Sequence, residues 1–243
     1  MGLIREIVRY SFMAYFNLFH KIDEIDKSNL PKEGAYILCS NHIHWMDPVL
    51  YVCENRRMVY AIAKEELFSS PIKAFIMNRL GVIPIKREIN GDNSNSLNTA
   101  IQKLKDGNLL LIYPEGTRFG FKKGVKQKKG VALLAIEAKV PIIPMAMVGC
   151  FKPFTKIRFK IGKPIDTSPY YPEEGSKVNL RNMVKLTNEV VEQIIKLRDE
   201  INTEEIEKQM NEAEEERERK KQLKLSKKEQ KLSIDSSKNS EKE

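Results

Sequence analysis

The stretch Leu109-Leu-Leu-Ile-Tyr-Pro-Glu-Gly-Thr-Arg118 decides the fold class of this chain. Because four consecutive residues are aliphatic, a strand here would present apolar side chains on both faces. This pattern predicts a strand that is buried on both faces of a sheet. A proline and a glycine then form a turn that presents Glu115, Thr117 and Arg118. In parallel sheets, ligands bind at the carboxyl ends of such strands, so polar residues in this turn are candidates for a site.

Similar short apolar runs recur before and after this stretch. We predict strands at 36–40, 58–62, 81–85, 109–113, 142–148 and 157–161, and helices at 95–106, 130–139 and 179–198. Strands and helices in alternation favour an α/β fold, with a mostly buried central sheet covered by helices on both faces.

The two ends of the chain differ from this middle part. Residues 3–22 carry apolar side chains at spacings of three and four, with Arg5 and Arg9 beside them, which predicts an amphipathic helix. Such a helix could lie in a membrane interface or dock on the protein's own core. Residues 199–243 have few aliphatic side chains, so we expect a charged tail, helical or disordered. We therefore divide the chain into an amphipathic N-terminal helix (1–30), which is a candidate for the membrane interface, a folded domain (31–198) and a charged tail (199–243).

Composition limits the classes of protein that this chain can belong to. Of 243 residues, 41% are hydrophobic, which excludes a wholly disordered chain, and three widely spaced cysteines favour a reducing compartment over a disulfide framework. The net charge is +9, with +12 on residues 1–198 and −3 on the tail. This balance suits an anionic partner, whether nucleic acid, phospholipid headgroup or acidic carrier protein. We expect neither a membrane-spanning helix nor a cleaved secretory signal.

The motif Ser40-Asn-His-Ile-His-Trp-Met-Asp-Pro-Val49 follows a predicted strand and holds two of the three histidines. His42 and Asp47 would lie on different sides of a regular helix, but Pro48 predicts that a helix begins here, with Asp47 as its N-cap. The two side chains can then meet from an irregular turn. A histidine oriented by a carboxylate is a general base for a hydroxyl. Because the chain lacks a G-x-S-x-G motif, that hydroxyl would belong to the substrate.

Other interpretations of these motifs stay open at this point. His42, His44 and Asp47 could bind a metal, as in a metal-dependent hydrolase, although no third clustered His or Cys completes a ligand set. They could also only cap a turn in a basic module that binds membranes or nucleic acid, although no nucleic-acid-binding motif is present. The segment 113–118 could be a turn before a solvated basic loop, and the pair Lys86-Arg87 is uninformative alone.

Four segments taken together resemble the ordered sequence blocks of the 1-acyl-sn-glycerol-3-phosphate acyltransferase family, over about residues 1–198: Asn41-His42-x-x-x-x-Asp47, Gly81-Val-Ile-Pro-Ile-Lys-Arg87, Tyr113-Pro-Glu-Gly-Thr-Arg118 and Val140-Pro-Ile-Ile-Pro144. The resemblance implies transfer of a fatty acyl group from acyl carrier protein or coenzyme A to the sn-2 hydroxyl of 1-acyl-sn-glycerol-3-phosphate. The product would be phosphatidic acid for phospholipid biosynthesis. Another lysolipid acceptor is the alternative. No metal or redox cofactor is called for.

The same resemblance implies roles for individual residues. His42 would be the general base and Asp47 would hold its working tautomer. The acceptor's phosphate would be bound at Arg87, Gly116, Thr117 and Arg118, in a loop organised by Glu115. Two basic steps, at 121–124 and 127–130, precede a predicted helix, and we prefer the second, where Lys128 and Lys129 would add positive charge. The enzyme would be peripheral or monotopic at the cytoplasmic face of a membrane, without a nucleic-acid partner.

Overall fold

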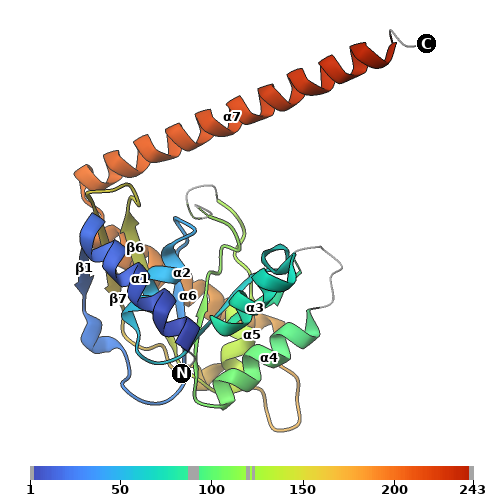
Figure 1. Cartoon of the computed structure of the whole chain (residues 1–243). Coiled ribbons are helices and arrows are strands. Elements are labelled where there is room, and N and C mark those ends of the chain that lie inside the picture. Colours follow the sequence, from blue (N-terminus) through green and yellow to red (C-terminus); the bar gives the residue numbers. More distant parts are fainter. Residues whose placement is uncertain (1–2, 87–92, 119–120, 122–123, 241–243) are drawn as a thin grey trace. The chain divides into compact units, whose positions relative to one another are not determined.

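The computed structural model describes residues 3–86, 93–118, 121 and 124–240, and the chain forms two compact units, Met1–Ile201 and Asn202–Glu243. The first unit holds a seven-stranded sheet with the order β1-β7-β6-β2-β5-β3-β4 (Figure 1). Its strands are β1 (His20–Ile25), β2 (Tyr36–Ser40), β3 (Val59–Lys64), β4 (Val82–Ile85), β5 (Leu109–Ile112), β6 (Ile142–Gly149) and β7 (Thr155–Ile161). Six of these seven strands lie within two residues of the predicted ones.

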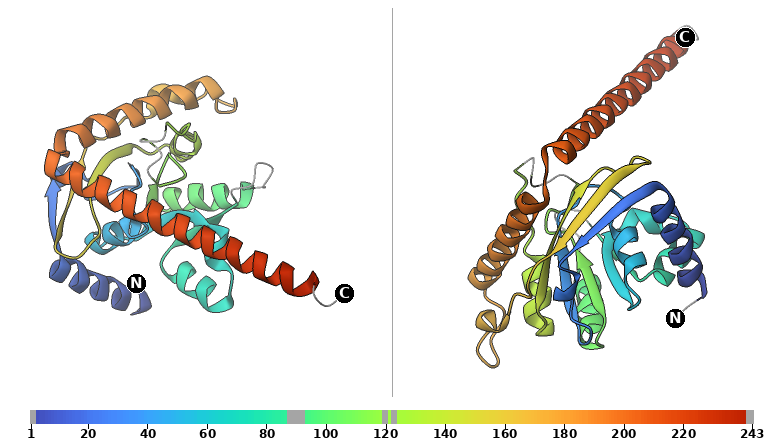
Figure 2. Two further views of the ribbon diagram at one scale, coloured as in Figure 1. Left: turned by 90° about the horizontal axis from the view of Figure 1, so that it is seen from above. Right: turned by 90° about the vertical axis from the view of Figure 1, so that its left-hand side faces the viewer.

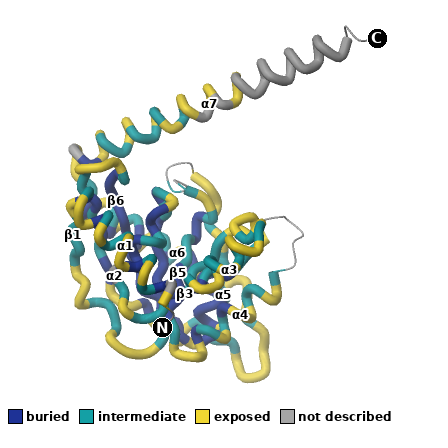
Figure 3. Tube along the Cα trace, viewed as in Figure 1, coloured by how far each residue is buried: buried dark blue, intermediate teal, exposed yellow. Residues whose placement is uncertain are grey.

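The sheet is mostly parallel. β6 and β7 pair antiparallel, and every other neighbouring pair is parallel. The carboxyl ends of β2, β5, β3 and β4 therefore lie side by side along the same end of the sheet. We call this end, at which these strands finish, the site edge. All residues of β2 and β6 are buried, so both faces of the sheet centre are covered, as their continuous apolar runs predict (Figure 3).

Two groups of helices provide that cover. α5 (Gly130–Ala138) and α6 (Leu180–Ile201) lie on one face, and α4 (Ser94–Lys105) packs beside α5. On the other face lie α1 (Leu3–Phe19), α2 (Asp47–Glu54) and α3 (Pro71–Arg79) (Figure 2). The helix α3 is not among the predicted elements.

The N-terminal helix is shorter than predicted. α1 ends at Phe19, and His20–Ile25 form the edge strand β1, which pairs with β7. The segment was wrongly included in the helix because its apolar residues continue the helical spacing, and because its strand partner lies far along the chain. Residues 20–25 therefore belong to the same sheet as the main domain.

The inner side of α1 carries two arginines. Arg5 is 2% exposed and donates to the Arg57 carbonyl at 2.9 Å, and Arg9 Nε donates to the Cys53 carbonyl at 3.0 Å. The Cys53 carbonyl lies in the last turn of α2, where unpaired backbone acceptors need partners, and Arg57 lies three residues beyond the end of this helix. The opposite side leaves large apolar residues exposed: Leu3, Ile7, Tyr10 and Leu18. One side of α1 thus docks on the protein, and the other forms an outward apolar stripe.

The second unit is dominated by α7 (Glu204–Ser240), a long charged helix. α6 continues to Ile201, whose side chain is 3% exposed, and the first compact unit ends at this residue. Across the described residues, we find no helix that combines the length and the apolar character needed to cross a bilayer.

Candidate active site

The loop from β2 to α2 brings His42 and Asp47 together. Asp47 Oδ2 lies 2.9 Å from His42 Nδ1, and Asp47 is 1% exposed while the His42 side chain is 18% exposed. Because a carboxylate oxygen accepts this bond, Nδ1 carries the hydrogen that joins the ring to Asp47. Asp47 thus fixes the Nδ1 side of the imidazole, and Nε2 lies on the opposite side of the ring.

The Asp47 carboxylate also organises the loop backbone. It accepts the N–H of Ile43 at 2.7 Å and the N–H of His44 at 2.9 Å, both to Oδ2. The predicted N-cap role of Asp47 is wrong: Asp47 is the first residue of α2, and Met46 occupies the cap position without a side-chain bond. The carboxylate thus bonds backward to the loop, where the Ile43 and His44 N–H groups are its backbone donors.

The His42 ring also rests on an aromatic ring from β5's end. Tyr113 stacks on it with 4.3 Å between ring centroids and 22° between planes. Burial raises the pKa of the Tyr113 hydroxyl well above its usual range, and the nearby carboxylates of Asp47 and Glu115 raise it further. This hydroxyl is therefore neutral at physiological pH. The stack restricts the orientation of the imidazole that Asp47 holds.

Glu115 joins the β5 loop to the β2 loop. Its side chain is buried, its Oε1 accepts the backbone N–H of His42 at 2.7 Å, and its Oε2 accepts the N–H of Phe121 at 3.2 Å. A buried carboxylate with backbone donors on both oxygens orders the two loops that it connects. Gly116 follows with φ of 61°, and its N–H closes the turn onto the Tyr113 carbonyl at 3.1 Å.

Lys128 reaches the same turn. Its N–H donates to the Pro114 carbonyl at 2.8 Å, and its side chain passes so close to Gly116 that a Cβ there would lie 2.9 Å from Lys128 Cε. Thr117 is exposed, Arg118 is partly exposed, and Lys129 precedes α5. The structure therefore gathers Gly116, Lys128 and their neighbours at the turn, whereas Arg87 lies outside the described residues.

Sequence reasoning assigned no role to Asn41, which anchors the β2 loop. Its Nδ2 donates to the Met147 carbonyl at 2.8 Å, and its Oδ1 accepts the Met147 N–H at 2.7 Å. The side chain thus continues the β2–β6 pairing by one more step. An asparagine directly after a wholly apolar strand was the available signal. His44, to which the family resemblance assigned no role, stacks on Phe151 with 4.6 Å between ring centroids.

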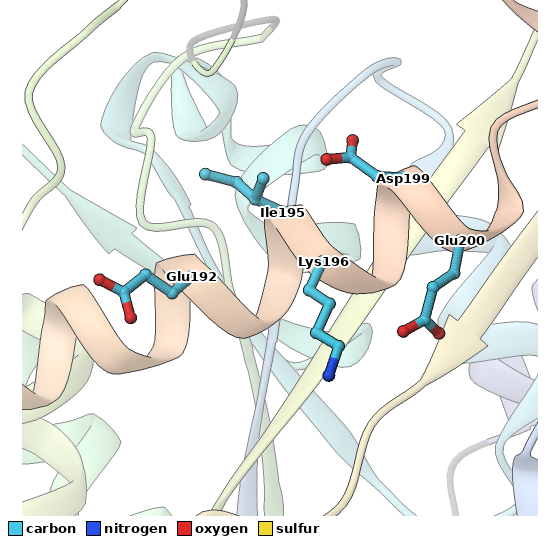
Figure 4. A pocket seen from close by; sticks show the side chains of 5 residues that line it. All are labelled: Glu192, Ile195, Lys196, Asp199 and Glu200. Carbon is cyan, nitrogen blue, oxygen red and sulfur yellow. The ribbon is translucent and has the colours of Figure 1, made fainter.

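Two other groups of residues lie outside this arrangement. Within the described part of the chain, no three His, Cys, Asp or Glu side chains gather where they could hold a metal ion. A pocket along α6 is lined by Glu192, Ile195, Lys196, Asp199 and Glu200 (Figure 4). None of the predicted site residues lines it, and Glu200 is already paired with Lys160 of β7 at 2.7 Å.

The fold and the site define an α/β protein with a histidine–carboxylate pair and a glycine turn at the carboxyl ends of parallel strands. The model of the family described as Acyltransferase matches residues 21–148, more than half of the chain, and the chain belongs to this family. The resemblance seen in the four sequence blocks is thereby confirmed.

Individual relatives agree with this assignment. The chain is 27% identical over 183 residues to the 1-acyl-sn-glycerol-3-phosphate acyltransferase of Bacillus subtilis, covering 72% of this chain and 89% of the relative. It spans only 39% of the chloroplastic enzyme BAT2 of Brassica napus, at 29% identity. The crystal structure of the 1-acyl-sn-glycerophosphate acyltransferase PlsC from Thermotoga maritima matches with a TM-score of 0.61 and 25% identity, over 83% of this chain and 81% of that chain.

Proposed function

We propose that the protein transfers a fatty acyl group from an acyl thioester to the sn-2 hydroxyl of 1-acyl-sn-glycerol-3-phosphate, giving phosphatidic acid. The observation that carries this proposal is the pair His42 and Asp47, 2.9 Å apart, beside a glycine turn with nearby cations. The names of the relatives and of the PlsC structure support the choice of acceptor.

His42 acts as the general base in this proposal. Its Nε2 takes the proton of the sn-2 hydroxyl while the hydroxyl oxygen forms a bond to the thioester carbonyl carbon. The tetrahedral intermediate then breaks its carbon–sulfur bond, and the proton on His42 passes to the leaving thiolate. Asp47 holds the imidazole in the reactive tautomer and stabilises the imidazolium. The products are an ester and a thiol, so no further reagent is needed.

The glycine turn holds the acceptor's phosphate. Gly116 lets the backbone approach the anion, Thr117 donates a hydroxyl and Arg118 offers a planar fork of donors. Lys128 and Lys129 add positive charge, and Arg87 contributes from the second sequence block. Glu115 organises the loop from its buried position, without contacting the phosphate itself.

The donor is acyl carrier protein or a coenzyme A thioester. Both carry negative charge, and both suit a domain whose residues 1–198 have a net charge of +12. Another lysophospholipid is the alternative acceptor. We place the enzyme at the cytoplasmic face of a membrane as a peripheral or monotopic protein, with the exposed apolar stripe of α1 in the headgroup region.

The decisive experiment measures transfer from a labelled acyl thioester to lysophosphatidic acid in detergent. It compares the intact protein with His42→Ala and with His44→Ala, a matched control on the same loop, after circular dichroism has verified folding. We expect His42→Ala to lose about 100-fold to 10,000-fold in kcat and His44→Ala to stay within a few-fold. Equal activity of intact protein and His42→Ala would refute the base assignment.

Two further arms separate the alternatives. Lysophospholipids with other headgroups replace lysophosphatidic acid, and a clear preference for one of them would correct the acceptor. A chelator is added in parallel; we expect no effect, and loss of activity would favour a metal-dependent reaction. Parallel reactions with acyl carrier protein and coenzyme A thioesters identify the donor.

A further inference from the structure

The helix α3 has no buried residue. Its nine residues, Pro71-Ile-Lys-Ala-Phe-Ile-Met-Asn-Arg79, include four large or medium apolar side chains, yet Ile72 is 74% exposed and Phe75 is 49% exposed. A helix of this length is not stable alone in water, and helical stability in proteins comes mainly from covering an apolar face. The contacts of α3 with the rest of the domain leave Ile72 and Phe75 on its outward side uncovered.

The apolar surface extends beyond the helix itself. The preceding 3-10 turn η2 (Glu65–Phe68) packs against α3 and leaves Leu67 47% exposed. We call Leu67, Ile72 and Phe75 the α3 surface. Large exposed apolar side chains that gather on one element mark an interaction site, whereas single scattered ones do not.

The position of the α3 surface relates it to the candidate active site. η2 begins where β3 ends, at the same site edge from which the His42 and Glu115 loops follow β2 and β5. The helix α3 also contacts α1, and both lie on the same side of the sheet (Figures 1 and 2). The α3 surface thus adjoins the helix that carries the outward stripe Leu3, Ile7, Tyr10 and Leu18.

Positive charge accompanies the α3 part of this surface, whereas η2 carries Glu65 and Glu66. Lys73 is exposed between Ile72 and Phe75 in the sequence, and the Arg79 guanidinium lies over the Phe75 ring, 5.0 Å from its centroid. Cations beside aromatic and aliphatic side chains are the composition that binds anionic lipid interfaces, because the chains enter the acyl boundary while the cations meet phosphates.

We infer that the α3 surface is a second membrane contact, separate from α1, which inserts Ile72 and Phe75 into an anionic bilayer. This inference rests on the proposed function, because an enzyme whose acceptor is a lipid needs its site edge at the bilayer. Two contacts on adjacent helices fix the tilt of the domain on the membrane, which one helix alone leaves free. The site edge then faces the lipid acceptor.

The test measures vesicle binding in the absence of donor and acceptor, so that its outcome is independent of catalysis. The full chain carrying Ile72→Ser and Phe75→Ser is compared with the intact protein on vesicles of phosphatidylcholine and phosphatidylglycerol. The matched control is Leu180→Ser with Val184→Ser, two exposed apolar positions on α6. We expect about a tenfold or greater loss of partitioning for the α3 variant and no loss for the control. Equal binding of both variants would overturn the inference.

A second measurement reports insertion directly. The three native cysteines are buried, so Ile72→Cys presents an exposed thiol for an environment-sensitive dye. We expect lipids with brominated acyl chains to quench the dye at position 72 and to leave a dye at Leu180→Cys unquenched. An unquenched dye at position 72 would refute insertion. If the α3 variant instead converts a lipid-free dimer into a monomer, the surface covers a second copy of the chain and the inference fails.

Discussion

The buried Glu115 carboxylate accepts the backbone N–H of His42 at 2.7 Å, although the two residues are 73 positions apart. This single bond connects the loop that carries the proposed base with the loop that carries the proposed phosphate site. The second carboxylate oxygen accepts the Phe121 N–H, so each oxygen of Glu115 binds one backbone donor. The two halves of the candidate site are thus held at a fixed separation.

Replacing this carboxylate tests the connection. Glu115→Gln retains one acceptor oxygen and opposes an N–H donor with its own NH2 group, so one buried bond is lost. We expect about a tenfold loss of kcat and about 1–3 kcal/mol less stability, measured by kinetics and urea unfolding. Glu137→Gln, an exposed position on α5, serves as control. Unchanged kcat in Glu115→Gln would show that the connection is not needed for catalysis.

Asp47→Asn tests the orientation of the base. The amide removes the charge that stabilises the imidazolium and allows the other histidine tautomer, in which Nε2 carries the hydrogen. We expect kcat to fall by about 100-fold to 10,000-fold, with a smaller change in the KM of the acceptor. Stability should also fall, because the Ile43 and His44 amides lose a charged acceptor. A variant with nearly normal kcat would contradict the orienting role.

Gly116→Ala tests the phosphate turn. A Cβ at this position combines backbone strain at φ of 61° with a contact of 2.9 Å to the Lys128 side chain. We expect about 1–2 kcal/mol of destabilisation and a several-fold higher KM for the acceptor. Gly124→Ala is a matched control, because φ there is 63° and no atom lies within 4 Å of the added Cβ. The idea fails if both variants raise KM equally.

His20 predicts a pH dependence of stability. It is buried against Tyr15, Phe16 and Phe151, and this burial lowers the pKa of its imidazole. The unfolded chain therefore takes up the proton first, so the His20 contribution to stability is complete above pH about 6.5 and declines as pH falls below it.

His20→Phe isolates this effect. Phenylalanine fills the aromatic cluster and cannot titrate, so urea unfolding at about pH 7.5 and about pH 5.5 should show a smaller loss for the variant than for the intact protein. Other groups titrate equally in both proteins, and only the difference between them reports on His20. Identical losses would show that His20 titrates normally in the folded state.

Removal of the tail should leave the enzyme active. We expect a chain that ends at Ile201 to retain full activity in detergent, since α6 and the sheet remain complete. A chain that ends at Arg198 should be less stable by about 1–3 kcal/mol, because it lacks buried Ile201 and the Glu200 partner of Lys160. Activity and thermal unfolding of both chains check this, and a folded but inactive chain ending at Ile201 would refute it.

Segments with strong local patterns were predictable. Continuous aliphatic runs such as Leu109–Ile112 and the buried β6 can only form interior strands, so their positions were right within two residues. β1 was not predicted, because its stability comes from pairing with β7, and the local sequence does not encode that pairing. α3 was not predicted, because its apolar residues are spread around the helix and show no helical periodicity.

The sequence by itself predicted the α/β class, the order of six of the seven strands along the chain and most residues of the candidate site, since each rests on runs or motifs within ten residues. It also predicted that His42 and Asp47 can meet, because Pro48 disfavours helical backbone at Asp47, the residue before it. Only the tertiary structure decided how the loops combine. The bonds from Glu115 to His42 and from Asn41 to Met147, and the contact of Lys128 with Gly116, depend on which strands become neighbours. Strand order is a property of the whole packed sheet, so no local pattern specifies it.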